Sequence, residues 1–374
     1  MRSVHVHLET APDKSFFVQK AANSMDLDLN KKLTHELTVD VDTETDYRVG
    51  VIVGSSGSGK STLAEELFGT VYEDKLDPTL PIIAQFPDSY DYEARQRALS
   101  GIGLTSIPCW CRPFNTLSTG QQDRATVALR FANQEVQEQD DDKPIVVDEF
   151  TSRVDRKVAA IMAHCVQKYA RKRQKRIVLV SCHSDIVDWL KPDWVIDCNT
   201  QTYTDYRDHE WSKKKLEITL RRTDKSIWKR FSKYHYLSDS VYPDNPFIYA
   251  VVYDGEVIGC QFWSNYAMKR NVLTKLHTNR TVIHPDYQSL GLGIHVINET
   301  AKVVNGKGYK LLGKFSNKAV ATSMSRSDQW KLLGTELEYK SVRLGNKSRL
   351  QRKQVSKRRL YNFEYIGDSV SSWD

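Results

Sequence analysis

Short apolar runs alternate with helix-type segments through the first half of the chain. RVGVIV (48–53), PIVV (144–147) and VLVS (178–181) are continuous apolar runs, which are typical of buried strands. Between them, STLAEELF (61–68) and a longer segment at 117–131 place apolar residues at helical spacing. Strands that alternate with amphipathic helices predict an α/β domain.

The pattern changes after residue 205. A charged segment follows, and two apolar runs then surround Asp254-Gly255, which predicts a β-hairpin because Asp-Gly suits a tight turn. The remaining pattern predicts strand, helix, strand and helix, as in an α+β domain. We therefore place a first domain at 1–205, a linker at 206–222 and a second domain at 223–374.

Composition is that of a soluble globular protein, with 40% hydrophobic and 27% charged residues among 374. No run of 18 apolar residues and no signal-like N-terminus is present, which predicts a cytoplasmic protein that is not inserted in a membrane. The six cysteines are scattered, as suits a reducing compartment. Cys109-Trp110-Cys111 has no second cysteine pair to accompany it, which disfavours a zinc site.

Positive charge is concentrated in the second domain. Residues 223–374 carry 24 Lys/Arg against 13 Asp/Glu, a net charge of +11, whereas the preceding residues have a net charge of −4. The excess peaks at 341–360, with eight basic residues and no acid. This asymmetry favours a polyanion such as nucleic acid, and a solvated basic tail is the alternative. Four aromatic residues flank the basic segment: Tyr339, Tyr361, Phe363 and Tyr365.

Residues 54–61 have the phosphate-loop pattern G-x-x-x-x-G-K-S between a strand and a helix. Its glycines let backbone N–H groups turn toward phosphate oxygens, Lys60 reaches the β- and γ-phosphates, and Ser61 ligates Mg²⁺. The predicted ATP-binding residues of this loop are Gly54, Ser55, Gly57, Ser58, Gly59, Lys60, Ser61 and Thr62.

Two carboxylates end the apolar strand KPIVVDEF. Asp148 would complete the Mg²⁺ shell, and Glu149 would polarise the attacking water. Together with the phosphate loop, this pair predicts an ATPase.

Further motifs resemble those of the ABC-type ATPases, in that family's order, across residues 30–200. Leu117-Ser118-Thr119-Gly120-Gln121 resembles the LSGGQ signature, with Thr119 in place of a glycine. Ser152–Asp155 resembles the D-loop, His183 the switch histidine, and Gln85 the glutamine that senses the γ-phosphate and the metal.

The ABC resemblance implies an ATP-dependent, head-to-tail homodimer. Ser118, Gly120 and Gln121 of one copy would cap the nucleotide held by the other copy, through a helix N-terminus. Because the chain shows no membrane segment, a soluble ATPase clamp or switch is favoured over a transporter.

HPDYQSLGLG at 284–293 is a second glycine loop, and it resembles the acyl-CoA motif of the GNAT acyltransferases. Its glycines would let the backbone approach a pyrophosphate at the start of the next helix. Asn317 resembles the family's asparagine after the following strand. The implied ligand is acetyl-CoA or another acyl-CoA, and the implied residues are Val282, Ile283, Gln288, Ser289, Leu290, Gly291, Leu292, Gly293 and Asn317.

One departure concerns the acid that protonates the leaving thiolate. The family often places a tyrosine for this purpose in the last helix, where we expect Trp330 to stand instead, and an indole cannot serve as that acid. The candidates for acid–base work on the acceptor side are His235, Tyr236, Asp239 and Ser316.

The combined domains resemble a prokaryotic and viral family of ABC ATPases fused to acetyltransferases, and the second half resembles the Mom proteins of phages, which modify adenine in DNA. This implies acyl transfer to a nucleobase of DNA or RNA, in a bacterial or virus-infected host cytoplasm. One alternative is a protein or small-molecule amine as acceptor, with the ATPase as a switch. Another is a nucleic-acid-binding ABC clamp with a degenerate GNAT domain.

Overall fold

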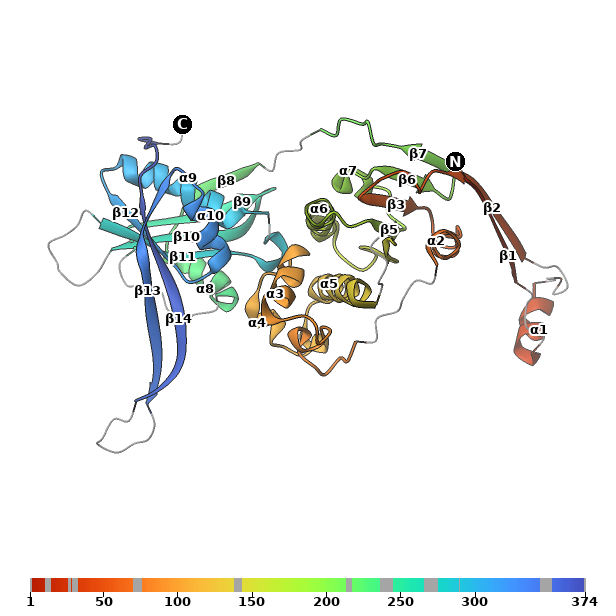
Figure 1. Ribbon diagram of the computed structural model, residues 1–374, viewed down its shortest axis with the longest axis horizontal. Helices are drawn as coiled ribbons and strands as arrows, with labels where there is room; N and C mark the ends of the chain where they lie inside the picture. The colour runs from red at the N-terminus through yellow and green to blue at the C-terminus, as the bar shows by residue number, and fades with distance from the viewer. Residues whose placement is uncertain are drawn as a thin grey trace. The chain divides into compact units, whose positions relative to one another are not determined.

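The computed structural model of the protein (Figure 1) has two compact units, Met1–Lys213 and Lys214–Asp374. The division falls inside the charged segment 206–222. Both units are mixed α/β, as the sequence predicts, and no described helix is long and apolar enough to cross a membrane. The structure describes residues 2–10, 15–25, 28, 33–69, 76–137, 143–212, 217–235, 245–265, 275–288, 290–343 and 352–372.

The first unit is built on a five-stranded sheet in the order β4-β5-β3-β6-β7. Its strands are β3 (Val49–Val53), β4 (Ile145–Val147), β5 (Ile177–Ser181), β6 (Trp194–Asp197) and β7 (Thr202–Asp205). The first four run parallel and β7 is antiparallel to β6. Every residue of β3, β4 and β5 is buried, as expected of parallel strands that are covered on both faces.

Alternate residues of β3 enter two different cores. Val51 packs in a core with residues of α3, α5 and α6, whereas Ile52 packs on the opposite face with α2 and the hairpin of β1 and β2. The sheet is therefore a middle layer. The elements around it are β1 (Arg2–Thr10), α1 (Phe16–Asn23), β2 (Leu33–Val41), α2 (Lys60–Phe68), α3 (Tyr92–Gly101), α4 (Ile107–Trp110), α5 (Thr119–Gln137), α6 (Arg156–Arg173) and α7 (Ile186–Leu190).

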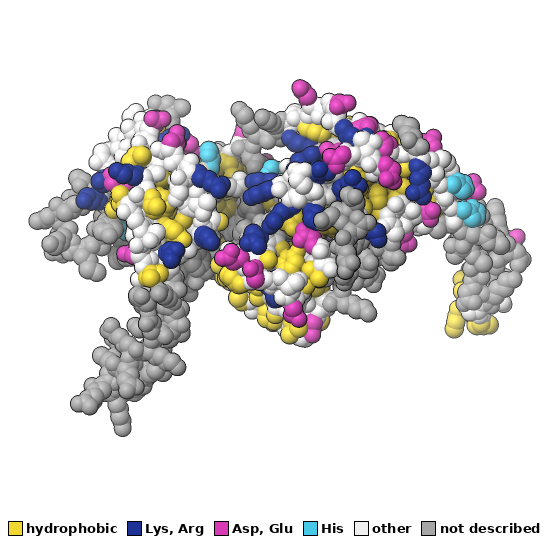
Figure 2. Space-filling model, in the orientation of Figure 1, with side chains coloured by type: hydrophobic (Ala, Val, Ile, Leu, Met, Phe, Trp, Pro, Cys, Tyr) yellow, Lys and Arg dark blue, Asp and Glu magenta, His cyan; other side chains and the backbone are white. Residues whose placement is uncertain are grey.

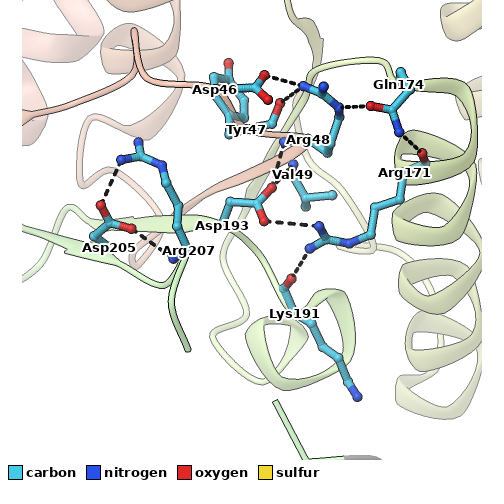
Figure 3. Close-up of polar contacts among 10 residues, drawn as sticks. All are labelled: Asp46, Tyr47, Arg48, Val49, Arg171, Gln174, Lys191, Asp193, Asp205 and Arg207. Carbon is cyan, nitrogen blue, oxygen red and sulfur yellow. Dashed lines mark hydrogen bonds and ion pairs between the residues drawn. The ribbon is translucent and has the colours of Figure 1, made fainter. Parts of the chain in front are cut away.

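Asp193 fixes the start of the central strand (Figure 3). Its Oδ2 accepts hydrogen bonds from the backbone N–H groups of Arg48 at 2.7 Å and Val49 at 2.8 Å. Its Oδ1 accepts from the Nη1 of Arg171, at the end of α6, at 3.1 Å. The carboxylate of Asp193, the residue before β6, thus joins β3 to α6. The phosphate loop therefore follows a strand whose start is held in place.

The second unit holds a seven-stranded sheet in the order β13-β14-β12-β11-β10-β9-β8. Its strands are β8 (Ile218–Arg222), β9 (Phe247–Tyr253), β10 (Glu256–Asn265), β11 (Lys275–Ile283), β12 (Lys310–Phe315), β13 (Trp330–Arg343) and β14 (Arg352–Tyr365). Only β11 and β12 are parallel neighbours. The last residues of the predicted linker form the edge strand β8.

Helices cover both faces of this sheet. α9 (Leu292–Gly306) and α10 (Lys318–Ser325) pack on one face, and α8 (Trp228–Phe231) packs on the other. The predicted hairpin is confirmed, because Asp254 (φ 49°) and Gly255 (φ 74°) make a turn with two positive φ angles between β9 and β10.

Trp330 lies in a strand, so its expected place in the last helix is wrong. α10 ends at Ser325, and Trp330 is the first residue of β13, paired with Tyr365 and only 3% exposed. Its indole Nε1 donates to the Oδ1 of Asn298 on α9 at 2.8 Å. Trp330 is therefore a core residue, and its position says nothing about the acid of the reaction.

The basic segment 341–360 lies largely in a hairpin. β13 and β14 pair from Trp330↔Tyr365 out to Arg343↔Arg352, and they extend as a two-stranded ribbon beyond the rest of the sheet (Figure 1). Residues 344–351 lie outside the described part of the chain. The backbone on either side of them is paired, which does not fit a solvated tail.

Candidate functional site

Three predicted motifs of the first unit meet at one edge of its sheet. The phosphate loop follows β3, Asp148 follows β4 and His183 comes two residues after β5. Because β4, β5 and β3 are parallel neighbours, their carboxyl ends lie at the same edge. The fold therefore places a phosphate loop beside two carboxylates and a histidine.

The phosphate loop has the conformation that its glycines predict. Gly57 (φ 79°) and Gly59 (φ 84°) adopt left-handed backbone, and Gly59 is the N-cap of α2. Lys60 is only 6% exposed, and its Nζ donates to the carbonyl of Ser55 at 2.7 Å. The Oγ of Ser58 is buried and lacks a hydrogen-bond partner among the described residues. A buried cation and an unsatisfied hydroxyl inside one loop fit a phosphate group.

Asn199 is a member of this site that sequence reasoning missed. Its Oδ1 accepts from the backbone N–H of Ser55 at 3.0 Å and from the Oγ of Ser55 at 2.8 Å. Its own N–H donates to Asp197 at the end of β6. Asn199 thereby holds the start of the phosphate loop, and the only sequence signal was a polar turn after an apolar strand.

The two carboxylates after β4 lie on a strained turn. Glu149 (φ 53°) and Thr151 (φ 64°) adopt the left-handed conformation without being glycine, which costs about 1–2 kcal/mol per residue. The Oδ1 of Asp148 accepts the N–H of Glu149 at 2.7 Å. Asp148 is half-buried and Glu149 is exposed. Such strain is commonly retained at functional sites, in keeping with metal and water binding here.

One salt bridge connects α5, the helix that the signature residues begin, to the D-loop, and another connects the start of α6 to the loop that follows His183. Arg153 of the D-loop pairs with Asp123 of α5 at 2.5 Å. Arg156 pairs with Asp185, two residues after His183, through its Nε at 2.9 Å. Burial raises the pKa of Asp123, and Arg153 opposes that shift. Movement of the D-loop would therefore break the ion pair between Arg153 and Asp123 or move α5 with it.

The signature residues cap α5. The N–H of Ser118 donates to the Oε1 of Gln121 at 3.2 Å, and the N–H of Gln121 donates to the carbonyl of Ser118 at 2.9 Å. A Cβ on Gly120 would lie 3.3 Å from Val158, so glycine permits the close packing of α5 on α6. Ser118 is exposed, which leaves this helix N-terminus open to a ligand.

The side chain of Gln85 forms hydrogen bonds with the backbone of the turn that precedes it. Its Oε1 accepts from the N–H of Asp77 at 2.9 Å, and its Nε2 donates to the carbonyls of Asp77 and Leu80 at 3.0 Å each. Its amide thus stabilises the preceding turn in this conformation. Its role as a metal and γ-phosphate sensor stays a prediction.

The second glycine loop stands beside a split in the sheet of the second unit. β11 and β12 pair only from Lys275–His277 to Lys310–Leu312, and beyond these residues the two strands have no ladder. The separated part of β11, residues 278–283, is roughly 20 Å long at about 3.3 Å per residue. Gly291 (φ 77°) is the N-cap of α9, the helix that follows β11 in the chain.

The residues of this loop hold its shape. The Nε2 of Gln288 donates to the carbonyl of Ile283 at 2.8 Å, which closes the loop onto the end of β11. The Nε2 of His284 lies 2.9 Å from the hydroxyl of Tyr234. Cβ atoms on Gly291 or Gly293 would meet nothing within 4 Å, so the space next to the start of α9 is open. Val282, Ile283 and Leu292 are buried, Leu290 is half-buried, and Ser289 lies outside the described residues.

Ser316 and Asn317 follow β12, at the other side of the split. The Oδ1 of Asn317 accepts from the N–H groups of Ala319 at 2.9 Å and Val320 at 3.3 Å. Asn317 is thus the N-cap of α10, and its side-chain oxygen is occupied by two backbone N–H groups of that helix. Ser316 is half-buried beside it.

A polar cluster surrounds a bulge in β11. Asn279 is the extra residue, because Arg280 pairs with Phe262 while Thr278 pairs with Trp263. The Nη1 of Arg280 donates to the Oδ1 of Asn279 at 3.0 Å. Sequence reasoning missed both residues, whose only signal is polarity inside a strand.

His235 belongs to the same region. Its ring lies 5.6 Å from that of Trp228, and the guanidinium of Arg280 lies 5.9 Å from the Trp228 ring. Burial, with a smaller effect of Arg280, lowers the pKa of His235 to about 4. His235 is therefore neutral at neutral pH. Tyr236 and Asp239 lie outside the described residues.

Metal binding by protein ligands alone has no support in the described part of the chain, where no cluster of three or more His, Cys, Asp or Glu side chains could hold an ion. Cys109 is buried and Cys111 is exposed, and both are free thiols. A Mg²⁺ ion would therefore need phosphate oxygens beside Ser61 and Asp148.

The chain is only distantly similar to the known proteins with which it was compared. No protein-family model and no curated protein matches the sequence. A dimeric bacterial ABC transporter cassette shares 19% identity, with a TM-score of 0.33 over 44% of this chain and 87% of that chain. A GNAT family acetyltransferase from Elizabethkingia anophelis with acetyl-CoA bound shares 11% identity, with a TM-score of 0.27 over 40% and 99%. A GNAT family N-acetyltransferase from Escherichia coli in complex with CoA shares 15%, with a TM-score of 0.26 over 30% and 71%. At these TM-scores the likeness carries no argument about activity.

Proposed function

We propose that the protein is an ATP-hydrolysing acyltransferase, which transfers an acyl group from acyl-CoA to an amine on a nucleobase. The observation that carries this proposal is the opening between β11 and β12 beside the left-handed Gly291 at the start of α9. A helix N-terminus suits the pyrophosphate, and unpaired strand edges suit the amide groups of the pantetheine arm. The phosphate loop at 54–61, in contrast, lies at the same sheet edge as Asp148 and Glu149. We therefore assign ATP to the phosphate loop and acyl-CoA to the loop at Gly291.

In the first unit, the phosphate loop would bind ATP. Lys60 would exchange the carbonyl of Ser55 for a phosphate oxygen, and the N–H groups of the loop would cradle the β-phosphate. Mg²⁺, held by Ser61 and Asp148 and sensed by Gln85, would neutralise charge on the phosphates. Glu149 would orient the attacking water.

The exposed start of α5 supports a dimer that forms with ATP. Ser118, Gly120 and Gln121 of a second copy would close over the γ-phosphate, so that hydrolysis opens the pair. The salt bridge from Arg153 to Asp123 would link the D-loop of each copy to its own signature helix. His183 would contact the γ-phosphate from the end of β5.

In the second unit, the acceptor amine would attack the thioester carbonyl near the Asn279 bulge. A C–N bond forms, the C–S bond breaks, and the amine loses a proton while the thiolate gains one. The neutral His235 would accept the amine proton, and Ser316 would donate a proton to the sulfur. The N–H of Asn279, the residue left out of the ladder with β10, is the proposed donor to the carbonyl oxygen of the thioester.

A nucleobase is the proposed acceptor because the second half of the chain carries a net charge of +11. A base inside a duplex must be flipped out before its amine can react, and an ATP-driven clamp could hold the strand open. A clamp that binds nucleic acid without acyl transfer is the second candidate, because the same positive charge would attract nucleic acid without any chemistry in the second unit.

Mass spectrometry of nucleosides from cells that express the protein tests the proposal. Wild type should add an acyl group to one nucleoside of DNA or RNA. Glu149→Gln should abolish the adduct, and Gly291→Asp should lower its amount. Gly291→Asn is the matched control, because it has the size of aspartate without its charge. Absence of any adduct from wild-type cells would leave the clamp as the better explanation.

A further inference from the structure

The outer face of α6 carries a row of positive charge in the less basic half of the chain. Lys157, Lys168 and Lys172 are exposed, and the neutral ring of His164 lies between them on the same face. Their spacing of seven, four and four residues places them on one side of the helix. Lys168 and Lys172 form no salt bridge with any other residue that the structure describes. Figure 2 shows Lys and Arg side chains gathered over α6 and α7.

Lys191, the C-cap of α7, extends this positive face. Partial burial, with smaller effects of Lys168 and Lys191, lowers the pKa of His164, so its ring is neutral and both lysines act on it. The Nζ of Lys191 donates to the carbonyl of Ser212, a neutral partner. Two arginines beside the row form ion pairs, Arg156 with Asp185 and Arg171 with Asp193.

The helix dipole explains only part of this charge. Cations in the last turn of a helix are stabilised by about 0.3–1 kcal/mol each, which accounts for Arg171, Lys172 and Arg173. That effect is confined to the last turn, so it does not extend to His164 or Lys157, and Lys191 belongs to another element. The row therefore needs a reason other than the stability of α6.

We infer that this face, formed by Lys157, His164, Lys168, Lys172 and Lys191, binds the phosphate backbone of a nucleic acid. Lys157 and Lys172 are about 22 Å apart along the axis at about 1.5 Å per residue. That length matches roughly six base pairs of duplex at about 3.4 Å each, so several successive phosphates can meet the row. Several lysines along one helix face suit a polymer with a charge at every repeat, and the neutral His164 among them can donate a hydrogen bond to a phosphate oxygen. The inference rests on the proposed nucleic-acid substrate and assigns it a surface on the ATPase unit.

Fluorescence anisotropy with a labelled DNA duplex of about 30 base pairs, and with an RNA strand of similar length, tests this surface. The variant is Lys168→Glu with Lys172→Glu. The control is Lys20→Glu with Lys143→Glu, two exposed lysines of the same unit, which changes the net charge equally. Neither pair belongs to the nucleotide site, so basal ATP hydrolysis should stay unchanged and reports correct folding.

Each phosphate contact contributes about 0.9 to the slope of log affinity against log salt concentration. Losing two contacts should lower the slope by about 1.8 and weaken binding roughly sixtyfold at ~0.1 M salt, taking ~1 M as the reference. The control should bind as the wild type does. Equal affinity of the α6 variant and wild type, or equal weakening in both variants, overturns the inference.

The failure of this surface is distinguishable from failure of the proposed function. If wild type binds nucleic acid through Lys168 and Lys172 but no nucleoside is acylated, the surface stands and the acyltransferase proposal fails. If nucleosides are acylated while the α6 variant binds normally, only the surface fails. If wild type binds neither DNA nor RNA, both fail.

Discussion

Gly291 offers a test in which charge and shape can be separated. It is the N-cap of α9 with φ 77°, and a Cβ there would meet no atom within 4 Å. Asparagine and aspartate both tolerate left-handed backbone and both are good N-caps, so Gly291→Asp and Gly291→Asn should fold alike. They differ by one negative charge at the place proposed for the pyrophosphate.

The size of the charge effect follows from Coulomb's law. Two unit charges about 5 Å apart repel by roughly 1 kcal/mol in water and by roughly 3 kcal/mol at an effective dielectric constant of ~20. The space beside Gly291 is open to solvent but bordered by protein, so the value should fall between these limits. Gly291→Asp should therefore weaken acetyl-CoA binding by about fivefold to about 150-fold.

Isothermal titration calorimetry with acetyl-CoA measures this difference, and thermal unfolding without ligand confirms that both variants are folded. Gly291→Asn should bind much more tightly than Gly291→Asp, and added salt should narrow the gap between them. Equal weakening by both substitutions would mean that shape, not charge, matters at this position. Wild-type affinity in both would place the pyrophosphate elsewhere.

Three other substitutions test separate parts of the molecule. Glu149→Gln should retain ATP binding and lose hydrolysis by about 10²–10⁴-fold, measured as phosphate release, and unchanged turnover would remove Glu149 from the mechanism. His235 has a lowered folded pKa of about 4, so its stabilising effect is present above the unfolded value and lost as pH falls from about 6.5 towards 4. His235→Gln should therefore reduce the loss of unfolding free energy at acid pH by roughly 1–2 kcal/mol, a value lowered to allow for solvent screening of a half-exposed ring. Urea unfolding at several pH values measures this loss, and the same pH profile in wild type and variant would contradict the burial argument. Trp330→Phe should cost about 1–3 kcal/mol because Asn298 loses its donor, and should leave the pH profile of acyl transfer unaltered; a shifted profile would return Trp330 to the chemistry.

Local chemistry by itself determined the positions of both glycine loops. The left-handed angles at Gly59 and Gly291 and the two-residue turn at Asp254-Gly255 follow from residue types that tolerate positive φ. The apolar runs around 49–53 and 177–181 likewise predict buried strands from their own composition. These features depend on neighbours within a few residues, so the sequence specifies them without knowledge of the fold.

Tertiary structure decided which of these pieces lie together. The sheet order placed Asp148 and His183 beside the phosphate loop and added Asn199, whose contacts to Ser55 cross 144 residues. The same kind of long-range pairing turned part of the predicted linker into β8 and moved Trp330 from an expected helix into β13. A strand carries its pattern in its own residues, but its partner is chosen by burial and hydrogen bonding across the whole chain, and no local pattern contains that choice.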